Sequence, residues 1–335
     1  GGVIVAGRRR KKSGGRSYAW RYRGRIVACV FVEVIIICAL VIMIGWNKGV
    51  KEWFEQFEQP VLKEVDISGI NSPNAILMQA RGGKILGEIN GEAQIYPASM
   101  TKIMTVILGI ENFDDLDEKI TLTDEMFAGL YEQDATQAGF QPGEEVRVID
   151  LLYGAMLPSG AECCIALADT ISGSEADFAE LMNKKARKLG MENTHFCDST
   201  GLHNPDHYST VKDIAVLMKY CIKNDTFREI VETSRHSTGV TNIHPDGITY
   251  YSTMFKNLSD PTVTGGKILG GKTGYTSEAG HCLVSFAEIE GREYIFVSAG
   301  ASGADGNTIP HIQDAVTVYN RVGAAIEAKM NDNNK

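Results

Sequence analysis

The chain has 335 residues, of which 44% are hydrophobic and 22% charged, and its formal net charge is −9. This composition excludes a disordered protein and allows one large domain or two ordinary ones. Its seven cysteines form no C-x-x-C pair, and no Cys or His spacing is typical of a tetrahedral zinc site. We therefore predict no metal site and no cofactor.

Basic charge is concentrated at the N-terminus. Residues 1–25 carry nine Lys or Arg and no acidic residue, and residues 26–44, which follow, carry a single charge, Glu33. A helix of this length spans about 28 Å, close to the hydrocarbon thickness of a bilayer. We predict a basic cytoplasmic tail over 1–25 and a transmembrane helix over 26–46, which places the remainder of the chain on the other side of the membrane.

The residues after this apolar stretch lack the A-x-A spacing of a cleavage site, so an anchor is favoured over a cleaved signal peptide. The tail is explained by membrane topology, and no nucleic-acid partner is predicted. Residues 47–63 mix aromatic and charged side chains, which is typical of an amphipathic stalk at the membrane surface.

Residues 64–330 are predicted to form the main domain. Its first element is a hairpin, with strands over 75–80 and 85–88, and a second hairpin with strands over 281–290 and 293–299 lies near the end. Helices are predicted between and after them, over 99–111, 146–157, 161–172, 175–189, 210–223 and 310–329. This order predicts an α+β fold, in which an antiparallel sheet from both chain ends is flanked by helices and interrupted by a helical insertion.

The predicted helix over 99–111 begins with Ser99 and Lys102, three residues apart and hence on one face. The helix is apolar nearly all round, so Lys102 is expected to be buried. A lysine can accept a proton from a serine only when it is neutral, which burial or a nearby cation favours. Ser209 and Lys212 have the same spacing, but there a capping serine or threonine before an amphipathic helix explains the pattern.

Two further segments carry groups suited to the same chemistry. Ser159 is predicted to lie in a loop between two helices, where it is either a helix cap or a hydroxyl held at a site. Lys272, Thr273 and Gly274 follow a glycine-rich run and precede the second hairpin, as a strand that presents a cation and a hydroxyl and lets a substrate backbone approach.

In this order the three segments resemble the penicillin-binding protein and serine β-lactamase superfamily, and their flanks resemble the low-molecular-mass D-alanyl-D-alanine carboxypeptidases. The flanks are Tyr96-Pro-Ala-Ser-Met-Thr-Lys102, Met156-Leu-Pro-Ser-Gly-Ala-Glu162 and Gly271-Lys-Thr-Gly-Tyr275, and Thr200-Gly-Leu202 and Tyr208-Ser-Thr210 also match. The resemblance covers residues 64–325 and implies a β-lactamase/transpeptidase-like fold.

The resemblance also implies roles. Ser99 would be acylated by a peptidoglycan stem peptide ending in D-Ala-D-Ala, Lys102 would take its proton, and Ser159 would pass a proton to the departing D-Ala. Lys272 and Thr273 would hold the substrate carboxylate or tune Lys102. Gly274 would allow close approach, and the N–H groups of Ser99 and Tyr275 would form the oxyanion hole. β-Lactams would be inhibitors, and the location would be a bacterial cell membrane, with the catalytic domain extracytoplasmic.

The chain departs from this family at two positions. The second segment usually ends in Asn, but here the residue is Ala161. Members also use an Arg after the third segment to grip the terminal carboxylate; Arg292 and Arg321 are not convincingly placed, and His311 lies near the expected position.

Three other functions are less well supported by the sequence. A β-lactamase would need a deacylating base, and no Glu is identified for that role. A membrane-tethered binder or sensor that acylates without turnover is kept open by Ala161. A zinc peptidase built on His203 and His207 lacks the Glu of H-E-x-x-H, and Pro205 prevents the required helix. The sequence does not decide between carboxypeptidase and endopeptidase action.

Overall fold

The computed structural model describes residues 34, 35, 37, 62–303 and 309–333. The predicted tail over 1–25, nearly all of the helix over 26–46 and most of the stalk over 47–63 lie outside these residues. Within the described part, no helix is both long and apolar enough to cross a membrane. Residues 60–335 form one compact unit.

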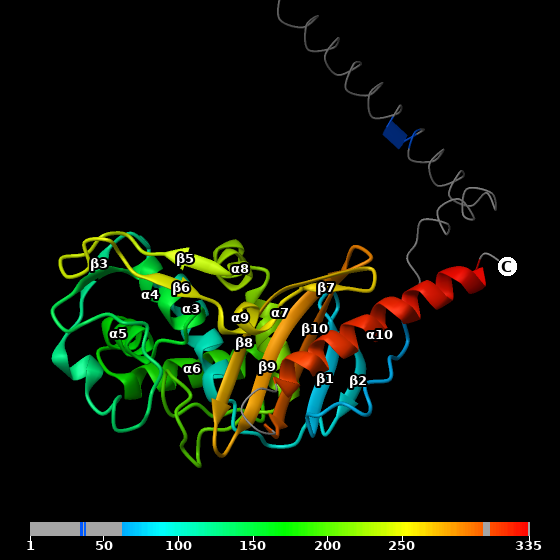
Figure 1. Cartoon of the computed structure of the whole chain (residues 1–335), viewed down its shortest axis with the longest axis horizontal. Helices are drawn as coiled ribbons and strands as arrows, with labels where there is room; N and C mark the ends of the chain where they lie inside the picture. The colour runs from blue at the N-terminus through cyan, green and yellow to red at the C-terminus, as the bar shows by residue number, and fades with distance from the viewer. Residues whose placement is uncertain (1–33, 36, 38–61, 304–308, 334–335) are drawn as a thin grey trace, which may run out of the picture. The chain divides into compact units, whose positions relative to one another are not determined.

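Both ends of this unit build one antiparallel sheet, as predicted (Figure 1). Its strands run in the order β2-β1-β10-β9-β8-β7, so the first hairpin pairs directly with the last strand. The bounds are β1 (Asn74–Gln79), β2 (Ile85–Ile89), β7 (Thr262–Val263), β8 (Gly266–Thr276), β9 (Gly280–Ile289) and β10 (Arg292–Ala301). The pairing of β1 with β10 joins residues more than 200 positions apart and closes the fold.

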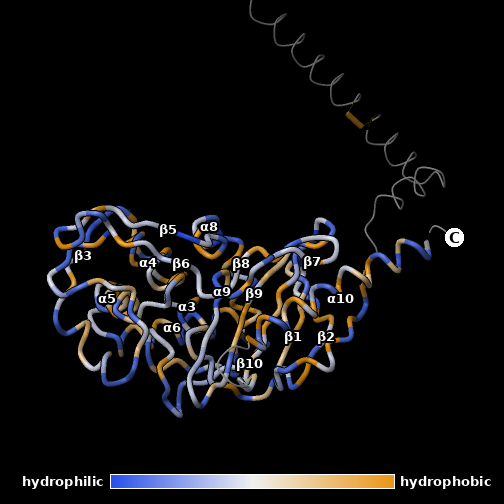
Figure 2. The backbone as a smooth tube through the Cα atoms, in the orientation of Figure 1, coloured by the Kyte–Doolittle hydropathy of each residue, from blue (hydrophilic) through white to orange (hydrophobic). Residues whose placement is uncertain are grey.

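The central strands are buried on both faces, because side chains alternate between two cores. Ile76 and Val297 face the core shared with the helical insertion, whereas Leu77 and Phe296 face the core under α10 (Pro310–Asn333). Figure 1 shows α10 lying along the sheet, and in Figure 2 its tube alternates between hydrophobic and hydrophilic. The predicted final helix is therefore present and is amphipathic.

The helical insertion surrounds one buried helix, α3 (Lys102–Asn112), in which eight of the 11 residues are buried. The other helices are α4 (Val148–Met156), α5 (Ala161–Ser172), α6 (Glu175–Leu189), α7 (Val211–Cys221), α8 (Asp225–Glu232) and α9 (Thr253–Asn257). The predicted apolar helix is thus central to its subdomain, and the predicted bounds of α5 and α6 coincide with those observed.

The structure differs from the predicted elements in several ways, among them the two short helices α8 and α9, which were not predicted. The predicted helix over 99–111 begins as a 3-10 turn, η1 (Ala98–Thr101), and becomes an α-helix only at Lys102. Two small sheets were not predicted, because strands of three residues carry no periodic signal. They comprise β3 (Lys119–Thr121) with β4 (Glu145–Arg147) and β5 (Arg235–Ser237) with β6 (Thr249–Tyr251); a second 3-10 turn, η2 (Asp124–Phe127), follows β3.

Candidate active site

Ser99 lies in the 3-10 turn at the start of the buried helix. Residues i and i+3 are eclipsed in a 3-10 turn, and Lys102 Nζ donates a hydrogen bond to Ser99 Oγ at 2.9 Å. Ala98, directly before the serine, has a φ of +47°, a conformation that is costly for a residue with a Cβ. The packing of the helix start therefore holds a strained backbone in place beside the serine.

Lys102 is 3% exposed and donates a second hydrogen bond, to the Thr200 carbonyl at 2.7 Å. Burial lowers the pKa of this lysine, and the negative charges of neighbouring groups, including Asp198 and Glu162, oppose that effect in part. An amine of lowered pKa in hydrogen-bond contact with a hydroxyl can accept the proton of that hydroxyl.

Lys272 lies on β8 and is 1% exposed, with Nζ donating to the Thr273 carbonyl at 3.0 Å. Burial and the charge of Lys102 lower the pKa of Lys272 strongly. The charges of the two buried lysines therefore disfavour one another. Of the two roles that the resemblance implies for Lys272, this position fits the tuning of Lys102 better than direct contact with a carboxylate, because Lys272 is not among the residues that line the pocket.

Ser159 occupies the turn between α4 and α5 and has a φ of +74°. Its hydroxyl is buried and has no hydrogen-bond partner. Gly160, rather than Ser159, is the N-cap of α5, and no side chain caps that helix. Capping therefore does not explain this serine, and a strained backbone with an unsatisfied hydroxyl is typical of a functional site.

Thr273, Gly274 and Tyr275 form the β8 wall opposite these groups. Thr273 Oγ1 lies 2.6 Å from Thr253 Oγ1, which orients the hydroxyl. A Cβ on Gly274 would lie 2.9 Å from the backbone nitrogen of Ser99, so the strand approaches the serine as closely as it does only because this residue is glycine. Tyr275 is 61% exposed.

These groups converge on a pocket of about 660 Å³. Of the predicted site residues, Ser99, Ser159, Thr273, Gly274 and Tyr275 line it, whereas Lys102 and Lys272 lie behind its wall. The other lining residues come from the segment between η2 and β4, the segment between α6 and α7, the β8–β9 hairpin and the start of α10, and include Gln133, Asp134, Thr136, His203, Glu278, His281 and His311.

Ala161 is buried and offers only its backbone N–H, which donates to the Thr136 carbonyl. The next residue, Glu162, was not recognised from the sequence. Its Oε1 accepts hydrogen bonds from the backbone nitrogens of Ala138 and Gly139 at 2.6 and 2.9 Å, and burial raises its pKa. Glu162 thus holds the loop that forms one wall of the pocket, while no side-chain amide is supplied at position 161.

His281 and His311 were not recognised as a pair. Their rings stack with centroids 4.9 Å apart and an angle of 7° between the planes. Burial and the neighbouring His281 lower the pKa of His311 to about 4, against the opposing effect of Asp314. His311 lines the pocket and, because its pKa is lowered, is a neutral imidazole at pH 7. The pairing arises between β9 and α10, which sequence spacing does not reveal.

The two histidines considered as zinc ligands, His203 and His207, have different surroundings. His207 is buried between Thr101 and Asp198, whereas the ring of His203 packs edge-on against Tyr96. The described residues contain no cluster of three or more His, Cys, Asp or Glu able to hold a metal ion.

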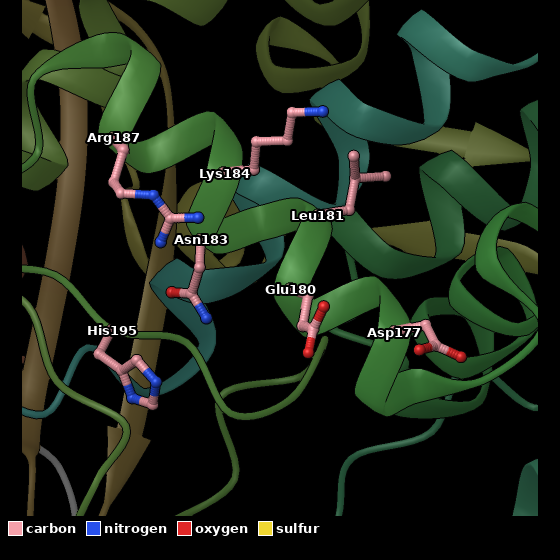
Figure 3. A pocket seen from close by; sticks show the side chains of 7 residues that line it. All are labelled: Asp177, Glu180, Leu181, Asn183, Lys184, Arg187 and His195. Carbon is pink, nitrogen blue, oxygen red and sulfur yellow. The ribbon is translucent and has the colours of Figure 1, made fainter.

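A second hollow, of about 520 Å³, lies on the outer side of α6 (Figure 3). Its lining residues are Asp177, Glu180, Leu181, Asn183, Lys184, Arg187 and His195. It presents charged ends of long side chains and contains none of the paired groups described above, so the chemistry is assigned to the pocket at Ser99.

The site combines a serine hydrogen-bonded to a buried lysine, a hydroxyl from a loop, and a Lys-Thr-Gly sequence on a strand of an antiparallel sheet. This combination defines the class of active-site-serine proteins with the penicillin-binding protein fold. The sequence pattern of the D-alanyl-D-alanine carboxypeptidases, peptidase family S11, matches residues 61–303. The chain belongs to this family, which confirms the resemblance seen in the sequence.

Curated relatives agree with this assignment. The chain is 35% identical to D-alanyl-D-alanine carboxypeptidase DacF of Bacillus subtilis over 231 residues, which cover 68% of this chain and 57% of the relative. It is 33% identical to DacC of Escherichia coli over 262 residues, covering 71% and 58%. The chain therefore spans less than two thirds of these two relatives.

Solved structures agree on the fold. The crystal structure of the Streptomyces K15 DD-transpeptidase superimposes with a TM-score of 0.68 and 29% identity, covering 78% of this chain and 100% of that one. The predicted α+β, transpeptidase-like fold is confirmed.

Proposed function

We propose that this protein is a serine-type D-alanyl-D-alanine carboxypeptidase that removes the terminal D-Ala from peptidoglycan stem peptides. The observation that carries the proposal is the 2.9 Å hydrogen bond between Lys102 Nζ and Ser99 Oγ, made by a buried lysine whose pKa is lowered by burial. Burial favours the neutral form of Lys102, which is the form that activates a serine.

In the proposed reaction, Ser99 Oγ attacks the carbonyl carbon of the penultimate D-Ala while Lys102 takes the hydroxyl proton. The oxyanion is bound by the backbone N–H groups of Ser99 and Tyr275. The C–N bond then breaks as Ser159 passes a proton to the amine of the departing D-Ala and is reprotonated by the Lys102 ammonium, which leaves Lys102 neutral again. Water attacks the ester and gives its proton to Lys102, which returns it to Ser99 Oγ as the ester bond breaks, and the shortened peptide leaves as a carboxylic acid.

The terminal carboxylate of the substrate would lie against Thr273, whose hydroxyl is fixed by Thr253, and against His311 at the start of α10. A neutral imidazole donates one hydrogen bond and carries no charge, so it grips a carboxylate more weakly than a guanidinium does. This arrangement supports a pocket that tolerates variation in the residue that leaves as the amine.

The membrane topology belongs to the same proposal. Nine basic residues precede an apolar stretch with a single charge, which favours a single-pass anchor over 26–46, a cytoplasmic N-terminus and an extracytoplasmic catalytic domain in a bacterial cell membrane. The lipid bilayer would then be a partner through residues 26–46. Retention of the full chain in the membrane pellet after an alkaline wash tests this.

The activity is tested by measuring D-alanine release from a peptide ending in D-Ala-D-Ala, with the full chain in detergent. Ser99→Ala should abolish release, whereas the matched variant Ser209→Ala should retain it. A β-lactam that labels the wild type and Ser209→Ala, but not Ser99→Ala, would confirm the nucleophile. Release that persists in Ser99→Ala would refute the proposed mechanism.

One observation favours a second function, a binder that is acylated without turnover. Position 161 supplies no amide to orient Lys102 or the substrate. Stable acylation by a β-lactam together with no D-Ala release from linear or cross-linked peptides would favour this function over the carboxypeptidase.

A further inference from the structure

The segment over 198–201 lies directly against the start of α3. Three side chains at the start of this helix form hydrogen bonds to it or to its neighbour His207. The contacts are Thr101 Oγ1 with His207 Nε2 at 2.9 Å, Lys102 Nζ with the Thr200 carbonyl at 2.7 Å, and Thr105 Oγ1 with the Ser199 carbonyl at 2.6 Å. The position of the Lys102 amine is therefore set by this segment as well as by its own helix.

Asp198 holds the segment in shape. Its Oδ1 accepts hydrogen bonds from Thr200 N at 2.8 Å, Thr200 Oγ1 at 2.7 Å and Gly201 N at 2.6 Å. Its Oδ2 lies 3.1 Å from His207 Nδ1. Burial opposes the negative charge, but the hydrogen bonds from His207, Thr200 and Gly201 outweigh it and lower the pKa of Asp198 to about 2.

The tautomer of His207 follows from its neighbours. Nδ1 faces both the Asp198 carboxylate and the backbone nitrogen of Cys197, at 3.1 and 3.2 Å. One ring nitrogen cannot donate to the first and accept from the second, and an ionised carboxylate attracts the proton more strongly. We therefore place a proton on Nδ1, where it bonds to Asp198, while Nε2 bonds to the Thr101 hydroxyl.

We propose that Asp198 is a positioning residue for Lys102. Its carboxylate fixes the Thr200 carbonyl that receives the Lys102 hydrogen bond, and its negative charge keeps the buried amine basic. The inference rests on the proposed function, in which Lys102 is the base that activates Ser99. Asp198 is not among the residues that line the pocket, so it acts on the reaction through the groups that it holds, and of these the Thr200 carbonyl contacts the Lys102 amine directly.

Other charged or titratable groups also face Lys102 and influence its pKa. On α5 they are Glu162, Cys163 and Cys164, and on β8 the group is Lys272. Burial and the repulsion between the lysines favour a neutral Lys102, whereas Asp198 and Glu162 favour a protonated one. The balance of these opposing effects determines the pH at which Lys102 becomes a base.

Asp198→Asn tests the proposal because the amide has the shape of the carboxylate and its oxygen can still accept from Thr200 and Gly201. The rate of Ser99 acylation is followed with a chromogenic cephalosporin as a function of pH. We expect the acid limb of this pH profile, over which the rate falls as Lys102 becomes protonated, to move about one unit to lower pH. The plateau rate should fall about tenfold, since a less basic amine is a weaker base.

Two controls separate charge from structure. Asp206→Asn removes an exposed acid from the same loop, and Glu175→Gln removes a carboxylate that bonds to Ser199 N and Oγ from the opposite side. In both variants, the acid limb of the pH profile of acylation should lie at the same pH as in the wild type. An unchanged acid limb in folded Asp198→Asn, or an equal shift in Glu175→Gln, would overturn the proposal.

A second measurement does not depend on reaction. In the full chain labelled with [13Cε]lysine, the Lys102 signal is assigned by its loss in Lys102→Met and titrated by NMR. Its midpoint should be lower in Asp198→Asn than in the wild type. A lowered midpoint in Asp198→Asn, together with no acylation of the wild type, would uphold this inference and refute the proposed function. An unchanged midpoint, together with normal acylation of the wild type, would refute this inference and uphold the proposed function.

Discussion

Two segments of this chain share the pattern Ser-x-x-Lys and differ in almost everything else. Lys102 is 3% exposed and bonds to Ser99 and to a backbone carbonyl. The side chain of Lys212 is 39% exposed and pairs with Glu92, which raises its pKa. Ser209 is fully buried, and its hydroxyl lies 2.8 Å from Thr194 Oγ1.

The two helices also start differently. Thr210 caps α7 by accepting from Asp213 N at 3.0 Å, whereas α3 grows out of a 3-10 turn without a side-chain cap. The second segment is a helix start with a surface ion pair. The first segment uses the same spacing to bring a hydroxyl to a buried amine, so environment rather than spacing distinguishes them.

The largest difference is expected from removing the lysines. Lys102→Met should lower the rate of Ser99 acylation by a β-lactam about a thousandfold, because general base catalysis typically contributes about 10²–10⁴. Lys212→Met should leave that rate unchanged. Stopped-flow acylation of both variants measures this; a Lys102→Met rate within tenfold of the wild type would show that another group takes the proton.

The next difference concerns two glycines of equal φ. Gly201 has a φ of +81°, and a Cβ there would lie 1.9 Å from the Ala98 carbonyl oxygen, next to Ser99. Gly173 has a φ of +82° and open space around it. Gly173→Ala should cost about 1–2 kcal/mol of backbone strain, and Gly201→Ala about 1–3 kcal/mol more from overpacking, with loss of acylation.

Chemical denaturation and acylation of both glycine variants provide the measurement. Because the backbone strain is the same, the difference between the variants isolates the contact with the start of α3. Equal stability and normal acylation in the two variants would mean that the segment over 198–201 moves freely relative to Ser99.

A smaller effect is expected from pH. The pKa of His311 is lowered from 6.5 to about 4 in the folded protein, so the unfolded chain binds the proton first as the pH falls. The contribution of His311 to stability is complete above pH 6.5 and is lost as the pH falls toward 4. Between pH 7 and 4.5 this loss amounts to about 2 kcal/mol.

The free energy of unfolding of the wild type should therefore fall by about 2 kcal/mol more over this interval than that of His311→Gln. His195→Gln, at an exposed histidine, serves as the matched control. Identical pH dependence in the wild type and His311→Gln would contradict a neutral, buried His311.

The smallest effect is expected at the helix starts themselves. Thr210→Ala removes an N-cap hydrogen bond and should cost about 1 kcal/mol. Ser99→Ala removes no cap and should change the free energy of unfolding by no more than about 0.5 kcal/mol. Denaturant titrations of both variants at one pH provide the comparison. An equal loss of unfolding free energy in both variants would show that Ser99 also caps its helix.

Much of the fold was predictable because its signals are local. Amphipathic periodicity located α6 and α10, and alternation with turn residues located both hairpins. The start of α3 was predicted as ordinary helix, because neither the strain at Ala98 nor the packing of Gly201 against it has a signature in the local pattern. The membrane helix over 26–46 and the domain boundaries stay predictions, as do the individual roles of Lys102, Ser159 and Lys272.

The sequence by itself determined the family, the α+β class and five of the residues that line the pocket, because these depend on motifs and on periodicity within short segments. Tertiary structure alone decided that Lys272 faces Lys102 rather than the pocket, that Asp198 and His207 lie against the start of α3, and that His281 stacks on His311. These are electrostatic and packing relations between residues about 30 to 170 positions apart, and such relations depend on the folded distance rather than on sequence spacing.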